Sequence, residues 1–368
     1  MTKKLFTPGP MNIPQTIRVQ LSKEIIHHRM PDFHKLFRQV REKLKYVFKT
    51  EQDVLILTSS GTGAMESSVI NLFNAGDWVL VINTGFFGER FIELCQTYGL
   101  RVVRLDYSWG NTYNLADVKR ALQKYPTIKG IFVTYHETST GVLNDIQSLG
   151  ELIKETNTLL IVDAISGLIV HPFHFDGWHV DCALSSSQKG FGLPPGLSFV
   201  TLSQKALARI EQGTNLPKYY FDYRKYMAYA KKGESPFTPS ITLIVGLNIA
   251  LEDIIERGIE TIVQEKNRLR QYTEEKFKQL GFELFITEPS IRGNVIVPVL
   301  SKKEWQLDLT DLTKYLDERY NLQVSKGQGK YSDQMLRVGL LSDFTEEDID
   351  ELVVRIEEYL LNLNNEVK

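Results

Sequence analysis

The sequence predicts an α/β fold with two parts, a large domain on a mostly parallel sheet of the seven-stranded type and a smaller C-terminal α/β domain. Short apolar runs, several of them β-branched, recur between residues 50 and 205, and amphipathic segments separate many of them. Strands that alternate with helices in this way pair in parallel through right-handed crossovers and are covered by helices. The length of 368 residues allows about two such domains.

The composition excludes several classes of protein. Lys and Arg number 43 against 45 Asp and Glu, so the net charge of −2 offers no basic surface for a nucleic acid. The two cysteines, Cys95 and Cys182, are too few for a disulfide framework or a four-thiolate metal site, and they fit a reducing, cytoplasmic setting. No stretch approaches 18 uncharged apolar residues, and the first residues lack an apolar signal-peptide core. We therefore expect no membrane span.

The chain begins with a predicted N-terminal arm over residues 1–14. The string TPGPMNIP has three prolines in eight residues, which favours an extended backbone. In the next string, FHKLFRQVREKLKYVF, apolar residues recur every three or four positions, which predicts a helix. This helix leads into the large domain, which we expect over residues 15–245.

Seven runs predict the strands of the large domain: DVLILT, WVLVIN, RVVRLD, GIFVTY, LLIVDA, VDCALS and LSFVTL. The segments GAMESSVINLF, GERFIELCQTYG, LADVKRALQKY and DIQSLGELIKET have helical spacing and lie between them. The stretch from residue 215 to residue 240 is aromatic and basic, shows no clear period and predicts a loop-rich connection that leaves the domain body. In a sheet of this kind, ligands bind at the carboxyl ends of the strands.

The C-terminal domain is expected over residues 246–368. A helical run, ITLIVGLNIALEDIIERG, bridges to it. A helix (NRLRQYTEEKFKQLG), a strand (GNVIVPVL), a helix (LTDLTKYLDERY) and a strand (QMLRVGLL) follow. The last helix is predicted from DFTEEDIDELVVRIEEYLLNL, because its start has a cap residue and an acidic first turn.

The string Ser60-Gly61-Thr62-Gly63 follows a predicted strand and opens a predicted helix. Small residues let backbone N–H groups approach an anion, and a helix N-terminus attracts negative charge, so a phosphate fits this turn. A plain strand-to-helix turn that merely needs glycine is the alternative. The string is not a dinucleotide fingerprint, because Glu66 replaces the third glycine.

Two ionisable residues lie at other strand ends. Asp163 ends the run LLIV, where a buried acid needs a cation or a hydrogen bond, although it could also cap the next segment. Lys189, in SSSQKGFGLPPG, directly follows VDCALS, where desolvation would lower its pKa and leave a nucleophilic amine; a surface lysine is the alternative. A phosphate cradle, an acid and an amine in one crevice are what pyridoxal phosphate requires. The acid keeps the pyridine nitrogen protonated, and the amine binds the aldehyde as a Schiff base.

At this point the chain resembles the class V aminotransferases, fold-type-I pyridoxal phosphate enzymes, in the branch of the alanine:glyoxylate and serine:pyruvate or serine:glyoxylate aminotransferases. Nine strings in order carry the resemblance: TPGPMNIP, HHRMPDF, SSGTGAME, NTGFFGER, HETSTGV, VDAISGL, SSSQKGFGLPPGLSF, SPFTPS and LRVGLL. The resemblance implies a homodimeric transaminase that moves the amino group of alanine or serine to glyoxylate or pyruvate with ping-pong kinetics.

The resemblance also implies a role for each matching residue. Lys189 would bind the cofactor aldehyde, and Asp163 would bind the pyridine nitrogen. Phe87 would stack on the ring in place of the tryptophan of many relatives, and Thr138 would lie near the ring oxygen. Arg337 would bind the substrate carboxylate. Ser60, Gly61, Thr62 and Gln188 would hold the phosphate together with Thr238 of the neighbouring subunit, and Pro8, Gly9 and Pro10 would line the substrate entrance.

Other interpretations of these residues stay open. Phe87 could be core, Arg337 could pair with a structural carboxylate, and Thr138 and Thr238 could belong to turns. The basic and aromatic stretch from residue 218 to residue 232 could stack on nucleic acid, but a solvated or subunit-facing loop fits the neutral charge better. We predict no metal site, because His171, His174 and His179 lack the spacing of a helical zinc pair.

Other functions stay open as well. A 2-aminoethylphosphonate:pyruvate aminotransferase has a similar arm, and a non-transaminating pyridoxal phosphate lyase or a hydrogenase-associated subunit is a further alternative. A cysteine desulfurase would need a reactive cysteine late in the chain, and none follows Cys182.

Overall fold

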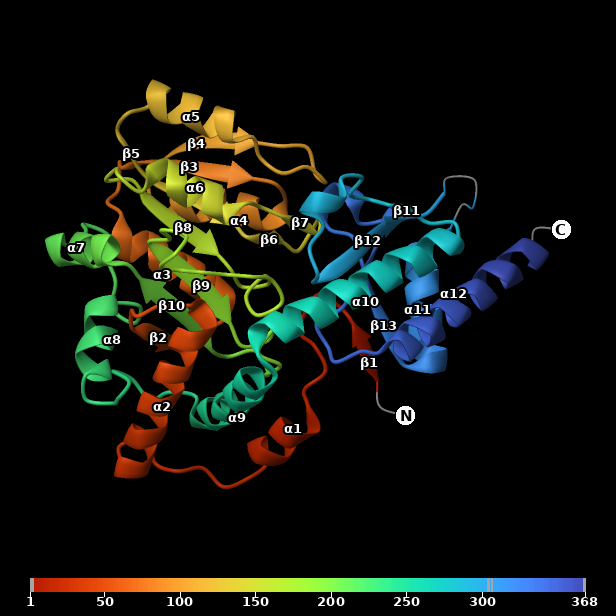
Figure 1. Ribbon diagram of the computed structural model, residues 1–368, viewed down its shortest axis with the longest axis horizontal. Helices are drawn as coiled ribbons and strands as arrows, with labels where there is room; N and C mark the ends of the chain where they lie inside the picture. Colours follow the sequence, from red (N-terminus) through yellow and green to blue (C-terminus); the bar gives the residue numbers. More distant parts are fainter. Residues whose placement is uncertain (1–2, 303–304, 306, 367–368) are drawn as a thin grey trace.

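A seven-stranded sheet forms the centre of the large domain in the computed structural model, which describes residues 3–302, 305 and 307–366 (Figure 1). The strand order is β2-β10-β9-β8-β5-β3-β4. Only β10 runs antiparallel to its neighbours, which confirms the mostly parallel sheet. Each of the seven predicted runs forms one strand: β2 (Val54–Leu57), β3 (Trp78–Asn83), β4 (Arg101–Asp106), β5 (Ile128–Thr134), β8 (Leu159–Asp163), β9 (Cys182–Ser186) and β10 (Ser198–Leu202).

Side chains that alternate along each strand divide the core into two layers, one on each face of the sheet. Leu80 and Ile82 of β3 join one apolar cluster, whereas Val79 and Val81 join the other. Helices α2 (Pro31–Phe48), α5 (Leu115–Lys124), α6 (Ile146–Ile153) and α9 (Ile241–Arg257) cover the first face. Helices α3 (Gly61–Leu72), α4 (Phe86–Thr97), α7 (Gln204–Gln212) and α8 (Tyr223–Ala230) cover the second.

Helix α8 corrects the prediction that residues 215–240 form a loop-rich connection leaving the domain body. Asp222 caps this helix by accepting the N–H of Arg224. Tyr223 and Tyr226 are buried against the large sheet, and the hydroxyl of Tyr223 lies 2.6 Å from that of Ser67. Sequence periodicity missed the helix because tyrosine serves equally well in a core, a loop and an interface.

A second sheet of five strands, with the order β1-β13-β14-β12-β11, builds the smaller domain beside the first (Figure 1). Its core includes side chains of α10, α11 and α12. The suggested division at residues 245 and 246 falls within α9 and stays a prediction. The expected residues 1–2 of the arm and 367–368 of this domain lie outside the described residues. The elements are β1 (Lys4–Phe6), β11 (Glu283–Leu284), β12 (Ile296–Leu300), β13 (Leu322–Lys326), β14 (Met335–Gly339), α10 (Ile259–Gln279), α11 (Leu309–Tyr320) and α12 (Glu346–Glu366).

The N-terminal arm begins as a strand of this second sheet. Strand β1 pairs in parallel with β13, and Phe6 stacks on Phe344 with 4.0 Å between ring centroids. Lys4 forms ion pairs with Asp348 and Glu351 of α12. The arm then runs to the large domain and ends at α1 (Gln15–Leu21). The residues between β1 and α1 are therefore tied to the small domain at one end and to the large domain at the other.

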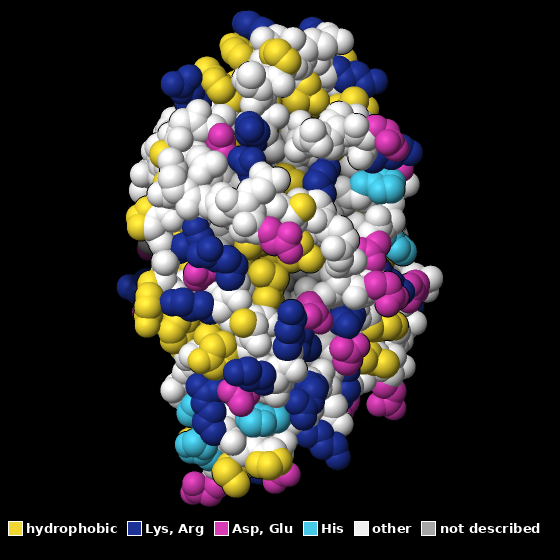
Figure 2. All heavy atoms as spheres, turned by 90° about the vertical axis from the view of Figure 1, so that its left-hand side faces the viewer, with side chains coloured by type: hydrophobic (Ala, Val, Ile, Leu, Met, Phe, Trp, Pro, Cys, Tyr) yellow, Lys and Arg dark blue, Asp and Glu magenta, His cyan; other side chains and the backbone are white. Residues whose placement is uncertain are grey.

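The face that carries α7 and α8 mixes acidic and basic side chains without a field of one sign (Figure 2). This agrees with the net charge of −2. Within the described part of the chain, no helix is long and apolar enough to cross a bilayer.

Candidate functional site

Asp163 and Lys189 lie at the carboxyl ends of the neighbouring strands β8 and β9. Asp163 is the last residue of β8, and one of its carboxylate oxygens accepts the N–H of Ile165 at 2.9 Å. Burial raises the pKa of this carboxyl to about 7, although the Ile165 N–H and the nearby cations Arg90 and Lys189 oppose the shift. A cation placed against Asp163 would therefore restore its charged form.

Lys189 follows β9 by three residues and is also buried. Its Nζ donates a hydrogen bond to the carbonyl of Pro8 in the N-terminal arm. A Cβ on Gly9 would lie 2.7 Å from this Nζ, so glycine lets the arm come this close. Burial lowers the pKa of Lys189 to about 8, with Arg337 and Arg90 adding to the shift and Asp163 opposing it. At pH values near 8, a large share of the Lys189 amine is therefore neutral and nucleophilic.

This pKa can be checked in the cofactor-free protein. Because the neutral amine is the form that reacts, acetylation of Lys189 by acetic anhydride should reach half its maximum near pH 8. A lysine in a model peptide should reach it near pH 10.4. Peptide mapping by mass spectrometry measures both, and added pyridoxal phosphate should protect Lys189. A midpoint at or above about 10 would show that the amine is not desolvated.

The N-terminus of α3 lies where the sequence predicts an anion cradle. Ser60 is its N-cap residue, and Gly61 and Thr62 begin the helix. Opposite them, Ser186 Oγ and Gln188 Oε1 are buried and have no hydrogen-bond partner within the described residues. A Cβ on Gly61 would come within 3.1 Å of Ser186 Oγ and would narrow the cradle. Free helix N–H groups and the spare Ser186 hydroxyl can donate to a phosphate such as that of the expected pyridoxal phosphate. An amide oxygen only accepts, so Gln188 would contribute through its Nε2.

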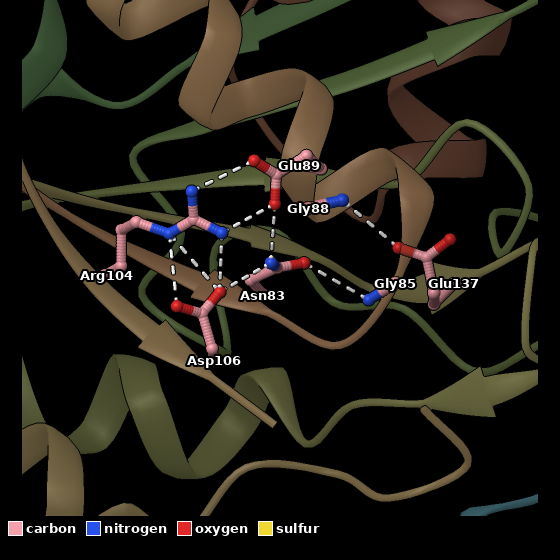
Figure 3. Close-up of polar contacts among 7 residues, drawn as sticks. All are labelled: Asn83, Gly85, Gly88, Glu89, Arg104, Asp106 and Glu137. Carbon is pink, nitrogen blue, oxygen red and sulfur yellow. Dashed lines mark hydrogen bonds and ion pairs between the residues drawn. The ribbon is translucent and has the colours of Figure 1, made fainter. Parts of the chain in front are cut away.

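Phe87 lies in the first turn of α4, where Arg90 covers its ring at 4.7 Å from the centroid. Arg90 also donates to Thr62 Oγ1 of the cradle at 3.2 Å. The buried carboxylate of Glu137 accepts the N–H groups of Phe87 and Gly88, both at 3.1 Å. Figure 3 shows the contact between Gly88 and Glu137. Glu137 thus caps α4 from outside the helix and fixes the backbone that presents Phe87.

A second network holds the same end of α4 from the other side (Figure 3). Asn83 accepts the N–H of Gly85 at 3.3 Å and donates to Glu89 and Asp106 at 2.9 and 2.7 Å. Arg104 forms ion pairs with both of these carboxylates. The strands β3 and β4 are thereby tied to the helix, so the backbone that carries the Phe87 ring is fixed.

Thr138 and Arg337 meet where the two domains face each other. The hydroxyl of Thr138 lies 2.6 Å from that of Ser166. Arg337, in β14, is buried and donates to the carbonyl of Thr138 at 3.1 Å. Burial lowers its pKa to about 10. Among the described residues no carboxylate forms an ion pair with Arg337, which argues against a structural ion pair and leaves its charge for a ligand.

Most of the sequence-predicted site residues therefore converge, and Thr238 is the exception. It lies on an exposed loop, and no described residue of the cradle is hydrogen-bonded to it. Sequence reasoning missed Glu137, Arg90, Ser186 and Ser166, although all four lie within or beside the strings that carried the resemblance. Their polar side chains in apolar surroundings were the available signal.

Two histidines of the string HPFHFDGWH have partners outside that string. The ring of His171 accepts the N–H of Asn294 at 2.9 Å, and His179 lies 3.1 Å from Glu151. The described residues contain no cluster of His, Cys, Asp and Glu arranged to hold a metal.

Comparison with known proteins gives a consistent picture. The family model described as aminotransferase class-V matches residues 19–352. The chain is 35% identical over 362 residues to the small subunit of a soluble hydrogenase from Synechococcus sp., covering 98% of this chain and 93% of that protein. It is 32% identical over 348 residues to L-aspartate–glyoxylate aminotransferase from Paracoccus denitrificans, covering 93% and 87%. The crystal structure of alanine–glyoxylate aminotransferase from Nostoc sp. matches with a TM-score of 0.92 at 28% identity, covering 98% and 96%.

Proposed function

Since this chain belongs to the class V aminotransferase family and uses pyridoxal phosphate, we propose that it transfers the amino group of alanine or serine to glyoxylate or pyruvate. The observation that carries the proposal is the meeting of Lys189, Asp163 and Arg337, an amine of lowered pKa, a buried acid and a buried arginine without a carboxylate partner among the described residues. Relatives named as glyoxylate aminotransferases support the choice of acceptor.

The residues divide the chemistry among them. When bound, the cofactor supplies an aldehyde for the amine and an electron-withdrawing ring. Lys189 Nζ would hold the aldehyde, and its lowered pKa would let it act as the base that takes the proton from the donor Cα. Asp163, when charged, would keep the ring nitrogen protonated. Phe87 would support the ring, and the cradle at Ser60, with Thr62, would hold the phosphate.

A half-reaction screen tests the proposal. Single amino acids are added to the purified holoenzyme without an acceptor, and the absorbance of the cofactor is followed. Alanine or serine should convert the cofactor, and glyoxylate or pyruvate should restore it, giving parallel lines in double-reciprocal plots. Conversion by 2-aminoethylphosphonate alone would favour the alternative transaminase. No conversion by any amine would favour a lyase or a hydrogenase-associated role.

Arg337 is proposed to bind the substrate carboxylate through its guanidinium group. Arg337→Lys keeps the charge and loses the guanidinium N–H groups, so we expect the KM for the amino donor to rise about ten- to a hundredfold with a much smaller change in kcat. Steady-state kinetics measure both constants. The matched control is Arg319→Lys, which alters an exposed arginine of α11. An unchanged KM for every amino acid would remove Arg337 from the site.

We also propose a cytoplasmic homodimer. The exposed position of Thr238 supports it, because this hydroxyl is free to reach the phosphate of a neighbouring subunit. Both cysteines are free and buried, which suits a reducing compartment. Sedimentation should give a dimer, and Thr238→Val should weaken cofactor retention in both sites. A monomer with full activity would contradict the shared site.

A further inference from the structure

The guanidinium of Arg337 has little donor capacity left for a carboxylate. Its Nε donates to the carbonyl of Lys326 at 2.8 Å. Its Nη1 donates to the carbonyl of Thr138 and to Gln328 Oε1, each at 3.1 Å. No acceptor of the described residues is hydrogen-bonded to Nη2. A bidentate carboxylate needs Nη2 together with either Nε or Nη1, and both of these are occupied.

Gln328 has the second N–H donor that a carboxylate bound to Arg337 Nη2 needs. An arginine side chain only donates, so the amide group that faces Nη1 must be the oxygen of Gln328. The two N–H groups of Nε2 are then unused, because no described residue accepts them. Nη2 of Arg337 and Nε2 of Gln328 are thus two spare donors that belong to one hydrogen-bonded pair.

We propose that Gln328 is a ligand of the substrate carboxylate, which binds Arg337 Nη2 and Gln328 Nε2 together. This inference rests on the proposed function and adds a specificity residue to it. The pair has one positive charge and a neutral amide, so it suits a single carboxylate. A second negative group on the substrate would find no second cation in this pair.

The loop that carries Gln328 is held by both domains. Tyr331 lies 5.7 Å from Trp109, which belongs to the large domain, and 4.9 Å from Phe285, measured between ring centroids. Lys330 Nζ lies 5.6 Å from the Trp109 ring centroid. Gly329 adopts a φ of 52°, and a Cβ there would lie 3.3 Å from the Trp109 ring. The amide of Gln328 is therefore placed before any substrate arrives.

Two variants test the proposal on the holoenzyme. Gln328→Leu removes both amide groups at similar volume, and Gln328→Glu places a carboxylate against Arg337 that competes with the substrate. We expect Gln328→Leu to raise the KM for the amino donor and for glyoxylate about ten- to a hundredfold with little change in kcat. Gln328→Glu should raise it by more than about a hundredfold. Gln323→Glu, on an exposed position of β13, is the matched control and should change neither constant.

Glycolate provides a readout that does not depend on turnover, because it carries the carboxylate without an exchangeable nitrogen. Calorimetry should show that both Gln328 variants bind glycolate more weakly than the wild type. The variant with the larger rise in KM should show the larger loss of glycolate affinity. Unchanged melting temperature and cofactor absorbance would show that the variants fold. If wild-type protein transaminates and Gln328→Leu matches it in KM and glycolate affinity, only this proposal is overturned. If no amino acid is converted but glycolate binding still depends on Gln328, only the proposed function fails.

Discussion

Lys189→Ala should abolish transamination, with a rate loss above about 10⁴-fold, because this side chain is proposed to supply both the covalent anchor of the cofactor and the base that moves the Cα proton. No other described side chain in the site combines burial with a lowered amine pKa of about 8. Initial rates with alanine or serine and glyoxylate measure the loss. Lys231→Ala, which changes an exposed lysine in the same domain, should keep wild-type activity.

Borohydride reduction tests the same assignment by chemistry instead of rate. The holoenzyme should retain the cofactor after reduction and digestion, and the label should map to the peptide that contains Lys189. The alanine variant should bind the cofactor without trapping it. Turnover that survives in Lys189→Ala, or a label on a different lysine, would show that the amine has been misassigned.

Asp163→Asn should lower kcat by about 10²- to 10³-fold, the usual cost of removing one fixed charge that stabilises a transition state. Asparagine has nearly the same shape and can still accept the N–H of Ile165, so the fold of the site should survive. The variant loses the negative charge that is proposed to keep the ring nitrogen protonated. Stopped-flow measurement of the half-reaction isolates this step from product release.

Asp308→Asn is the control for this variant, because Asp308 caps α11 outside the site and asparagine caps a helix equally well. We expect its activity and melting temperature to match those of the wild type. A loss below about tenfold in Asp163→Asn, equivalent to about 1.4 kcal/mol, would count against Asp163 as the partner of the ring nitrogen.

Strands buried on both faces could be predicted well from sequence. Most strands of the large sheet are buried, and a segment such as LLIVD has no polar alternative to full burial. The partly exposed edge strand β4 was predicted as well. Strand β1 was not predicted, because its three residues pair with residues 322–324, which are distant in the sequence. Strand β13 and helix α8 were missed for a related reason. Their burial depends on neighbouring segments that the local sequence pattern does not indicate.

The residues of the candidate site likewise fall into two groups, those that the sequence predicts and those that it does not. Ser60, Asp163 and Lys189 were predictable because strand ends of a parallel sheet meet at one edge, whatever the details of packing. Gln328 and Glu137 were not predictable. Their roles depend on which donors of Arg337 are already used and on where the first turn of α4 lies against the string HETSTG. Such facts arise only when segments distant in sequence come into contact.

The amino-acid sequence by itself determined the α/β architecture, the positions of its main strands along the chain and the identity of the residues suited to a pyridoxal phosphate enzyme, because burial and strand-end position follow from local apolar patterns. Tertiary structure alone decided the closeness of the Pro8 carbonyl to the Lys189 amine and the spare donors of Arg337 and Gln328. Hydrogen-bond partnership is a property of surroundings assembled from both domains, and no single segment of the chain contains it.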